Sequence, residues 1–576
     1  MEFFIIFSIS VIVSILNSFH VLIQWTLNKP GELFTAIPHF FADYFLYVGA
    51  MAQGAAGRWI WMDNLFTNEP THPTWYYWFY VSLGHIGSWL NLSPFATYNG
   101  SLIILVFLLC LVWYYLTKTL YPTNRPIRLT TWLLILTITN FISFARPGLA
   151  KLGVLNFAQI ELLGQFWFSP SPVFSRLGGV PYHVVQSILF ILLAITFAQR
   201  IDSKIIARGK SSSRGNMLAW LQSTRFDSFV SLVIGHWKLV ILAALAGSAN
   251  PVQMLVFGIA AAITVSLNGH VSIHRKIALI ALLFLAGGAG AWMTQSEFSR
   301  QAVFLAARSW ELVQQVRNDP SILILSIGPV ILFAPFGIRK VFRDKNPLST
   351  LLVIWGLLSF ALFLSPIPRL LALSPVRFLH PVPYAASLAI LGVVGLVALA
   401  GMIHDRMKKM VSKNAIYGCL IIFYLLLTVP AVYRQFIDRI TPARNPQLLM
   451  DTIYNHVPAP IADALSWLKM TGRHPVSNAS VVLVDPAIPI EVLVPVFTGL
   501  PSFSGHPIHT LYPDVKEAKR QEFFGGKMSP KEVEQFLKDH RIGYIITTTQ
   551  YNRLDHTSLF KKVYQNEMLI IFQTNI

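Results

Sequence analysis

The sequence predicts a multi-pass α-helical membrane protein with a small α/β domain at its C-terminal end. Three observations support this class: 54% of the 576 residues are hydrophobic, only 12% are charged, and apolar runs recur along the first three quarters of the chain. Soluble globular proteins carry roughly 25% charged residues, so the scarcity of charge excludes an ordinary soluble protein. After residue 440 the long apolar runs stop and polar residues become frequent.

The apolar runs predict about eleven membrane-spanning helices, since crossing the hydrocarbon core takes about 20 apolar residues. The first run, Phe3 to Ile23, has neither a basic segment before it nor a small-residue cleavage site after it, so we expect a retained anchor. The run Trp75 to Leu90 is shorter and rich in interfacial aromatic rings, and we expect it to lie at the membrane surface. The further predicted spans are Tyr98–Leu116, Thr130–Phe144, His183–Ala198, Phe229–Ala246, Val252–Leu267, Ile277–Met293, Ser321–Gly337, Thr350–Ser365, Phe378–Ala400 and Ala415–Val432.

The basic residues predict an orientation. The formal net charge is +19, but the basic residues form short clusters between apolar runs, which is typical of cytoplasmic loops and not of a nucleic-acid-binding surface. If Trp75 to Leu90 does not span, every compact basic cluster falls on the cytoplasmic side. The sequence therefore predicts a plasma-membrane protein with a membrane domain at 1–440, a long external loop at 25–96 and an extracytoplasmic α/β domain at 441–576.

Helix and strand patterns alternate in the C-terminal domain. Ala459 to Met470 has apolar residues at helical spacing, and Ser529 to Asp539 begins with Ser-Pro-Lys-Glu, which is typical of a capped helix. Short β-branched runs at Ser480 to Asp485, Gly543 to Thr549 and Met568 to Gln573 predict strands.

The long external loop carries the ionisable residues that are candidates for a chemical role. Its ionisable side chains lie among many Trp, Tyr and Phe rings. The spanning runs, in contrast, hold few charged residues near their centres, whereas an ion-coupled transporter needs such residues there. The sequence also lacks a P-loop and the GxGxxG, HExxH and GxSxG motifs. We therefore expect the chemistry at the outer membrane surface. The candidate residues of the loop are Asp43, Arg58, Asp63, Glu69 and His72.

No metal site is predicted from the residues. Cys110 and Cys419 lie in separate apolar runs, which excludes a disulfide framework or a cysteine metal site. The pair His506 and His509 flanks a proline and lacks a third ligand.

Four segments of the chain carry a resemblance to a known family. They are Asp43-Tyr-Phe-Leu-Tyr, Gly57-Arg-Trp-Ile-Trp, Thr67-Asn-Glu-Pro-Thr-His-Pro-Thr-Trp and Leu83-Gly-His. Together they resemble the first external loop of the GT-C superfamily of glycosyltransferases, which use polyprenyl-phosphate-linked sugars and include protein O-mannosyltransferases and lipid A aminoarabinose transferases. The chain departs from the family in lacking an adjacent pair of acids at Asp43.

The resemblance implies a site and an activity. An acid just after the first helix is catalytic in the family, and Asp43 occupies that place as the expected general base. Arg377, in a Pro-Val-Arg-Phe-Leu-His-Pro element similar to one that helps to hold the lipid-linked phosphate, is expected to bind the donor phosphate. The implied partners are a polyprenyl-phosphate-linked sugar donor, a glycan, lipid or protein acceptor, and membrane lipids. No cofactor is implied, and a divalent metal ion has no support. The possible substrate contacts are Arg58, Asp63, Glu69 and His72, with Asp63 or Glu69 as any second acid.

Other interpretations of the same residues stay open. Asp43 can be a solvated acid at a helix start, Arg377 an arginine that reaches lipid headgroups, and His72 a helix cap. The whole chain can instead be a lipid-carrier flippase or exporter, which needs a continuous polar path through its helices. A non-catalytic membrane scaffold is the third alternative, and it would tolerate the loss of Asp43 and Arg377.

Overall fold

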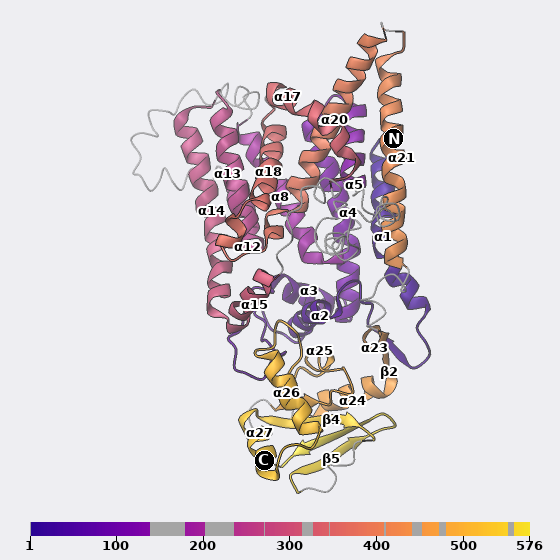
Figure 1. Cartoon of the computed structure of the whole chain (residues 1–576), viewed down its shortest axis with the longest axis vertical. Helices are drawn as coiled ribbons and strands as arrows, with labels where there is room; N and C mark the ends of the chain where they lie inside the picture. Colours follow the sequence, from indigo (N-terminus) through magenta and orange to yellow (C-terminus); the bar gives the residue numbers. More distant parts are fainter. Residues whose placement is uncertain are drawn as a thin grey trace. The chain divides into compact units, whose positions relative to one another are not determined.

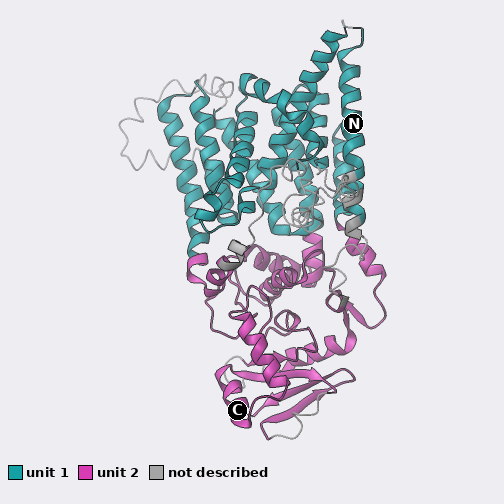
Figure 2. Cartoon of the chain, viewed as in Figure 1, with its two compact units in different colours: residues 1–17, 102–296, 311–438 teal, residues 18–101, 297–310, 439–576 magenta. Residues whose placement is uncertain are grey.

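The computed structural model describes residues 2–138, 179–201, 236–269, 271–313, 327–344, 346–407, 410–440, 452–471, 480–550 and 558–575. These residues are mostly helical and include one two-stranded and one four-stranded sheet (Figure 1). Their contacts divide the chain into two compact units (Figure 2). Unit 1 comprises residues 1–17, 102–296 and 311–438, and unit 2 comprises residues 18–101, 297–310 and 439–576.

Seven of the described helices are long and apolar enough to cross a membrane. This finding confirms the predicted class of a multi-pass helical membrane protein. In α21 the span ends at Pro430, although the helix continues. The seven helices are α1 (Glu2–Thr26), α4 (Pro94–Leu120), α8 (Pro181–Ile201), α14 (Ile273–Arg300), α18 (Pro347–Leu364), α20 (Pro381–Arg406) and α21 (Lys413–Ile440).

Shorter helices accompany these spans. Two predicted spans correspond in their described parts to α5 and α12, while residues 139–144 and 229–235 of those spans lie outside the described residues. The shorter helices of unit 1 are α5 (Arg125–Thr137), α12 (Trp237–Ala249), α13 (Pro251–Leu267), η2 (Pro329–Leu332), α17 (Ala334–Asp344), α19 (Ile367–Leu370) and η3 (Pro375–Phe378).

The predicted span Ser321 to Gly337 is wrong as one continuous helix. Within its described part, η2 forms a 3-10 helix after Gly328, whose φ is 78°, and α17 begins only at Ala334. The cause is local, because proline has no backbone N–H to donate within a helix and Pro329 and Pro335 lie in this stretch. A positive φ at Gly328 also turns the chain out of helical geometry.

The core of unit 1 fixes the position of η3. Trp355 of α18 packs edge-to-face on Phe257 of α13, with ring centroids 5.0 Å apart. The indole N–H of Trp355 donates to Gln253 over 3.2 Å, and the amide of Gln253 donates to the backbone oxygen of Arg377 over 2.9 Å. A buried amide thus connects the aromatic core to the 3-10 turn that carries Arg377.

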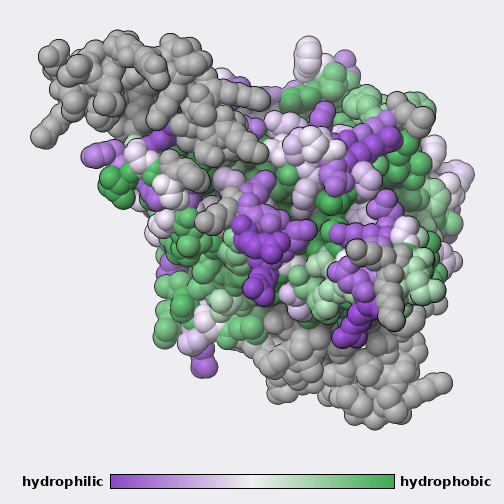
Figure 3. All heavy atoms as spheres, turned by 90° about the horizontal axis from the view of Figure 1, so that it is seen from above, coloured by the Kyte–Doolittle hydropathy of each residue, from purple (hydrophilic) through white to green (hydrophobic). Residues whose placement is uncertain are grey.

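Basic residues mark one set of helix ends in unit 1. They occur in the last turns of α4, α8 and α20 and in the first turns of α5, α14 and α21, which is the alternation expected when successive helices reverse direction. Arg300, Arg369 and Arg377 are exceptions that lie toward the other helix ends. Seen from above, the molecule shows hydrophilic residues gathered between hydrophobic ones (Figure 3). The basic residues in these first and last helical turns include Lys118, Arg125, Arg200, Arg275, Lys276, Arg406 and Lys413.

In unit 2, residues 25–96, the predicted external loop, fold around two helices, α2 (Phe41–Ala55) and α3 (Trp78–Trp89). Glycines allow close approach: a Cβ added to Gly54 would lie 2.1 Å from the carbonyl oxygen of Val81, and one on Gly84 would lie 2.1 Å from that of Met51. With 12 residues, α3 is about 18 Å long, whereas the hydrocarbon core is about 30 Å thick. The helix is therefore too short to cross a membrane.

The C-terminal segment adds a four-stranded sheet to unit 2, with strand order β3-β4-β6-β5. The β3–β4 pair is parallel and the two other pairs are antiparallel. Apolar side chains of α26 and α27 pack with those of β3, β4 and β6 in one core. The elements are α24 (Ala459–Thr471), β3 (Val481–Val484), α25 (Leu493–Thr498), α26 (Pro513–Phe524), α27 (Pro530–Asp539), β4 (Ile542–Thr548), β5 (Phe560–Gln565) and β6 (Leu569–Thr574).

This small domain confirms the predicted C-terminal α/β class and its predicted elements. The expected helices are α24 and α27, and Ser529 forms the capping box with Glu532. The three expected strands are β3, β4 and β6. The sequence did not predict α25, α26 and β5.

A second, two-stranded sheet joins the N-terminal and the C-terminal segments of unit 2. Strand β1 (Glu32–Phe34) pairs antiparallel with β2 (His456–Pro458), which follows the short helix α23 (Thr452–Asn455). Next to this pair the hydroxyl of Thr35 donates to the backbone oxygen of Tyr454 over 2.6 Å. The external loop and the C-terminal segment are therefore hydrogen-bonded to one another within unit 2. Helix α15 (Ala302–Val313) lies mostly in the same unit.

Candidate active site

Asp43 lies in the first turn of α2. A carboxylate is favoured there because the N-terminal end of a helix carries partial positive charge. Its Oδ1 is 3.7 Å from Nε2 of His506, a ring that is 1% exposed, and the Asp43 side chain is 22% exposed. Asp43 therefore lies between solvent and a buried imidazole contributed by the C-terminal segment.

The hydrogen bonds of His506 determine which ring nitrogen carries its proton. Nδ1 accepts backbone N–H groups from Ile508 over 3.0 Å and from His509 over 3.1 Å. A nitrogen that accepts hydrogen bonds has no proton, so the neutral ring carries its N–H on Nε2, the atom that faces Asp43. His506 therefore has no free lone pair for a substrate proton. Of these two groups, only the carboxylate can act as a base.

The loop that bears His506 is fixed by Thr510. The hydroxyl oxygen of Thr510 accepts the backbone N–H groups of Gly505 and His506 and donates to the backbone oxygen of Phe66. Because Phe66 belongs to the external loop, these bonds tie the imidazole to the same segment as Asp43.

His509 extends the cluster to Tyr77. Its Nε2 is 2.9 Å from the Tyr77 hydroxyl, and its ring lies edge-to-face with that of His506, with centroids 4.9 Å apart. Burial holds the pKa of His509 well below its ordinary value, and His506 lowers this pKa further while Asp43 opposes the shift. His509 is therefore neutral at neutral pH.

Acidification is expected to destabilise unit 2 through His509. An unfolded histidine binds a proton near its ordinary pKa of about 6.5, whereas folded His509 stays neutral well below that value. The unfolded state thus binds more protons in acid, so stability is full above about pH 6.5 and falls as the pH is lowered through it. The measurement is the thermal unfolding midpoint of the full chain in lipid as a function of pH.

The variant His509→Gln tests this source of pH dependence. Burial also lowers the pKa values of His456 and His540, so those rings should retain part of the dependence in the variant. An unchanged slope in His509→Gln would contradict the assignment.

The two other predicted acids of the loop have basic partners. Asp63 is ion-paired with Arg58. Glu69 accepts from the ammonium of Lys516 over 2.7 Å, and Lys516 also donates to Thr67 and to the backbone oxygen of Phe503, each over 2.9 Å. Burial lowers the pKa of Lys516, and Glu69 opposes that shift.

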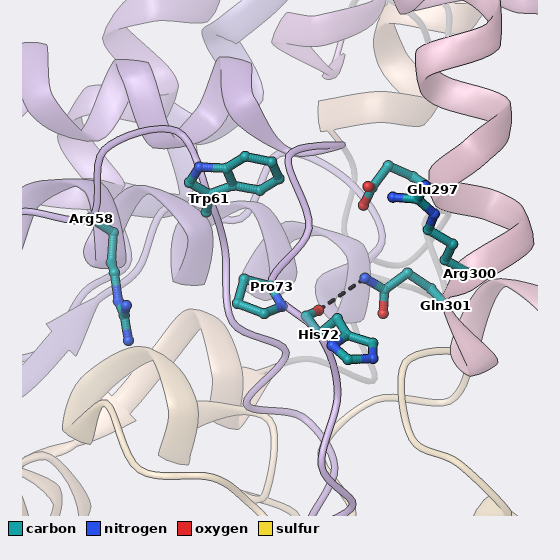
Figure 4. Close-up of a pocket in the computed structure, with 7 residues that line it drawn as sticks. All are labelled: Arg58, Trp61, His72, Pro73, Glu297, Arg300 and Gln301. Atoms are coloured by element: carbon teal, nitrogen blue, oxygen red, sulfur yellow. Dashed lines mark hydrogen bonds between the residues drawn. The ribbon is translucent and has the colours of Figure 1, made fainter.

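A cavity of about 570 Å³ lies beside the loop in unit 2. Residues of the loop line one side and residues from the end of α14 line the other (Figure 4). The amide of Gln301 donates to the backbone oxygen of His72 over 2.9 Å, and the Glu297 carboxylate accepts from Thr74 over 2.8 Å. The lining residues are Arg58, Trp61, His72, Pro73, Glu297, Arg300 and Gln301.

A much smaller second cavity lies between this one and the histidine pair. It shares His72 and Gln301 with the large cavity, and Tyr77 and His509 also line it. The structure thus brings Asp43, the two buried histidines and the large cavity into one region of unit 2. Of the predicted substrate contacts, Arg58 and His72 line the large cavity.

Arg377 belongs to unit 1. It lies in η3 with an exposed side chain, and its backbone oxygen accepts the Gln253 amide.

Sequence reasoning missed several residues of this region. His506 and His509 were weighed only as a metal pair, and Glu297, Arg300 and Gln301 were not singled out. No group of three or more metal-ligating side chains occurs in the part of the chain that the structure describes. The useful signal was the His-Pro-Ile-His spacing itself, because a short turn lets one imidazole accept backbone N–H groups with one nitrogen while its other nitrogen lies near Asp43.

Comparison with known proteins gives structural similarities. No protein-family model matches the chain, and no curated protein matches it in sequence. The apo oligosaccharyltransferase of Archaeoglobus fulgidus is similar over 94% of this chain and 69% of its own, with 12% identity and a TM-score of 0.46. The archaeal oligosaccharyltransferase AglB in complex with an inhibitory peptide and a dolichol-phosphate is similar over 92% of this chain and 69% of its own, with 11% identity and a TM-score of 0.44. Mycobacterial arabinofuranosyltransferase AftD is similar over 98% of this chain and 41% of its own, with 12% identity and a TM-score of 0.47.

These proteins are glycosyltransferases by name.

Proposed function

We propose that the chain is a membrane glycosyltransferase that moves a sugar from a polyprenyl-phosphate donor to an acceptor hydroxyl. The observation that carries the proposal is the pairing of Asp43 with the buried N–H of His506 at 3.7 Å. Asp63 and Glu69 have their charges balanced by Arg58 and Lys516. Asp43 occupies the place of the catalytic acid in the resemblance and is the loop carboxylate next to His506, so we assign the proton transfer to it.

The proposed step is a direct displacement. The acceptor oxygen attacks the anomeric carbon, and its proton passes to the Asp43 carboxylate. The bond from the anomeric carbon to the phosphate oxygen breaks, and its electron pair leaves with the polyprenyl phosphate. The phosphate is a weak base and leaves without a general acid. Attack opposite the leaving group inverts the anomeric centre.

His506 acts on this step through Asp43. Its Nε2, which carries the ring proton, lies 3.7 Å from Oδ1 of Asp43 and places a positively polarised group beside the carboxylate. The two backbone N–H groups on Nδ1 hold the ring in place. His506 is thus a positioning residue.

The resemblance of the Arg377 segment assigns the departing phosphate to that residue. A guanidinium offers a two-pronged hydrogen-bond donor that matches phosphate oxygens. This assignment stands on the sequence motif and on the exposure of the Arg377 side chain.

An extracytoplasmic site is part of the proposal. Lys118 is in the last turn of α4, whereas the external loop enters α4 at its first turn, Pro94. If the basic helix ends face the cytoplasm, as the positive-inside rule favours, the loop lies on the opposite side. A transferase there has no nucleotide sugars and needs a donor carried by a lipid.

The test is sugar transfer by the purified full chain in lipid, with a panel of polyprenyl-phosphate sugars and a mixture of glycan, lipid and peptide acceptors. We expect release of polyprenyl phosphate and a product of inverted anomeric configuration. A retained configuration would contradict the direct displacement. Movement of intact donor across the bilayer, or no reaction with any donor, would overturn the transferase proposal.

A further inference from the structure

The large cavity of unit 2 is lined by charged side chains of both signs. They are the guanidiniums of Arg58 and Arg300 and the carboxylate of Glu297. Arg58 is ion-paired with Asp63 outside the lining. Arg300, in the last turn of α14, has no ion-pair partner among the residues that the structure describes. The cavity therefore offers a guanidinium to an anionic group of a ligand.

An aromatic ring lines the same cavity. Trp61 is 43% exposed, and Pro73 lies beside it in the lining (Figure 4). A large exposed indole is costly to hydrate and gains from an apolar partner. The C–H face of a sugar ring is such a partner, and its hydroxyl groups stay at the ring edge.

Planar polar groups complete the lining on the side of α14. Glu297 is 6% exposed, and one of its oxygens accepts from Thr74. Gln301 is 6% exposed and is held by its bond to the His72 backbone. Buried polar groups with fixed positions suit hydroxyl recognition, since a ligand without matching groups leaves them unsatisfied.

We propose that this cavity binds an acidic sugar, a ring that carries a carboxylate or phosphate group. The ring stacks on Trp61, its hydroxyls bond to Glu297 and Gln301, and its anionic group binds Arg300. That this sugar is the acceptor rests on the proposed function, because His72 and Gln301 join this cavity to the one that His509 lines. The binding itself does not depend on transfer.

The experiment is calorimetric binding to the full chain in lipid nanodiscs. The probes are oligosaccharides of equal length that end in glucuronic acid, in glucose 6-phosphate or in glucose. A charge-assisted bond favours both acidic probes over the neutral one by roughly 10- to 100-fold in dissociation constant. The ratio between the two acidic probes identifies the preferred anion.

The variant Arg300→Gln should abolish the preference for acid and leave the affinity for the neutral probe within about twofold. Arg308→Gln is the matched control. Arg308 lies on α15, the next helix after Arg300, and is also exposed, but it does not line the cavity. Equal affinities of the wild type for all probes, or equal losses in the two variants, would overturn the proposal.

Binding and transfer separate the two proposals. Acid-selective binding without any transfer would retain the cavity assignment and remove the transferase. Transfer with no preference for acidic acceptors and no effect of Arg300→Gln would retain the transferase and remove the cavity assignment.

Discussion

Replacement of Asp43 by asparagine is expected to lower the rate of sugar transfer by about 10²- to 10⁴-fold, the usual contribution of a general base. Asparagine preserves the shape of the side chain but cannot accept the proton. Donor binding should change little, so the loss should appear in kcat and not in KM. The measurement is the initial rate of polyprenyl phosphate release under saturating donor.

Asp514→Asn is the control for this variant. Asp514 also supplies the acidic group in the first turn of a helix, α26, and is exposed. Both changes remove a favourable charge at a helix start, which is worth about 0.3–1 kcal/mol, but only the first removes the base. Equal rates for Asp43→Asn and wild type would place the base elsewhere.

A companion change, His506→Asn, separates the positioning role from folding. The asparagine oxygen can accept the backbone N–H groups that Nδ1 accepts, while the N–H that faces Asp43 is lost. We expect a lower kcat with unchanged KM and an unchanged unfolding midpoint. A fall in the midpoint together with a raised KM would indicate a purely structural histidine.

Replacement of Glu69 by glutamine is expected to destabilise unit 2 by about 3 kcal/mol, the lower end of the cost of breaking a buried ion pair. The Lys516 side chain is 4% exposed, and Glu69 is its carboxylate partner at 2.7 Å. The glutamine oxygen can still accept from the ammonium, which also keeps its bonds to Thr67 and Phe503, but the opposite charge is lost. The measurement is the urea dependence of proteolysis of the C-terminal segment in the full chain.

The exposed pair of Glu534 and Lys538 on α27 provides the comparison. Such surface pairs contribute about 0–1 kcal/mol, so Glu534→Gln should cost less than Glu69→Gln by a wide margin. The double variant Glu69→Gln, Lys516→Met removes the stranded charge and should recover much of the stability. Similar costs for both single variants would contradict the role assigned to Lys516.

The sequence predicted what local pattern determines. Apolar length located the spanning helices, and the Ser529 capping signal located α27. The apolar run at 321–337 predicted one helix because its hydropathy is high. Its prolines and a glycine interrupt the helical backbone there, and hydropathy does not report this. Strand β5 was missed because it has two exposed lysines and lies at the sheet edge.

The partners within the candidate site could not be read from spacing. Asp43 was found by its place after the first helix, but its contact with His506 joins segments that lie far apart in the chain. The same holds for Glu69 and Lys516, whose ion pair spans 447 positions. Arg300 and Gln301 become cavity residues only because the end of α14 lies against His72. Such contacts follow from tertiary packing and leave no periodic signal.

The pairing of β1 with β2 sets an order of events during biosynthesis. The hydrogen bond from Thr35 to Tyr454 spans 419 positions, and ribosomes add roughly 5–20 residues each second. The external loop therefore waits roughly 20–80 s after its own synthesis before its partner strand emerges. Throughout that interval Asp43 lacks His506, and the aromatic rings of the loop need protection from aggregation. A nascent chain thus acquires a complete acid–imidazole pair only after the segment that carries His506 has been made.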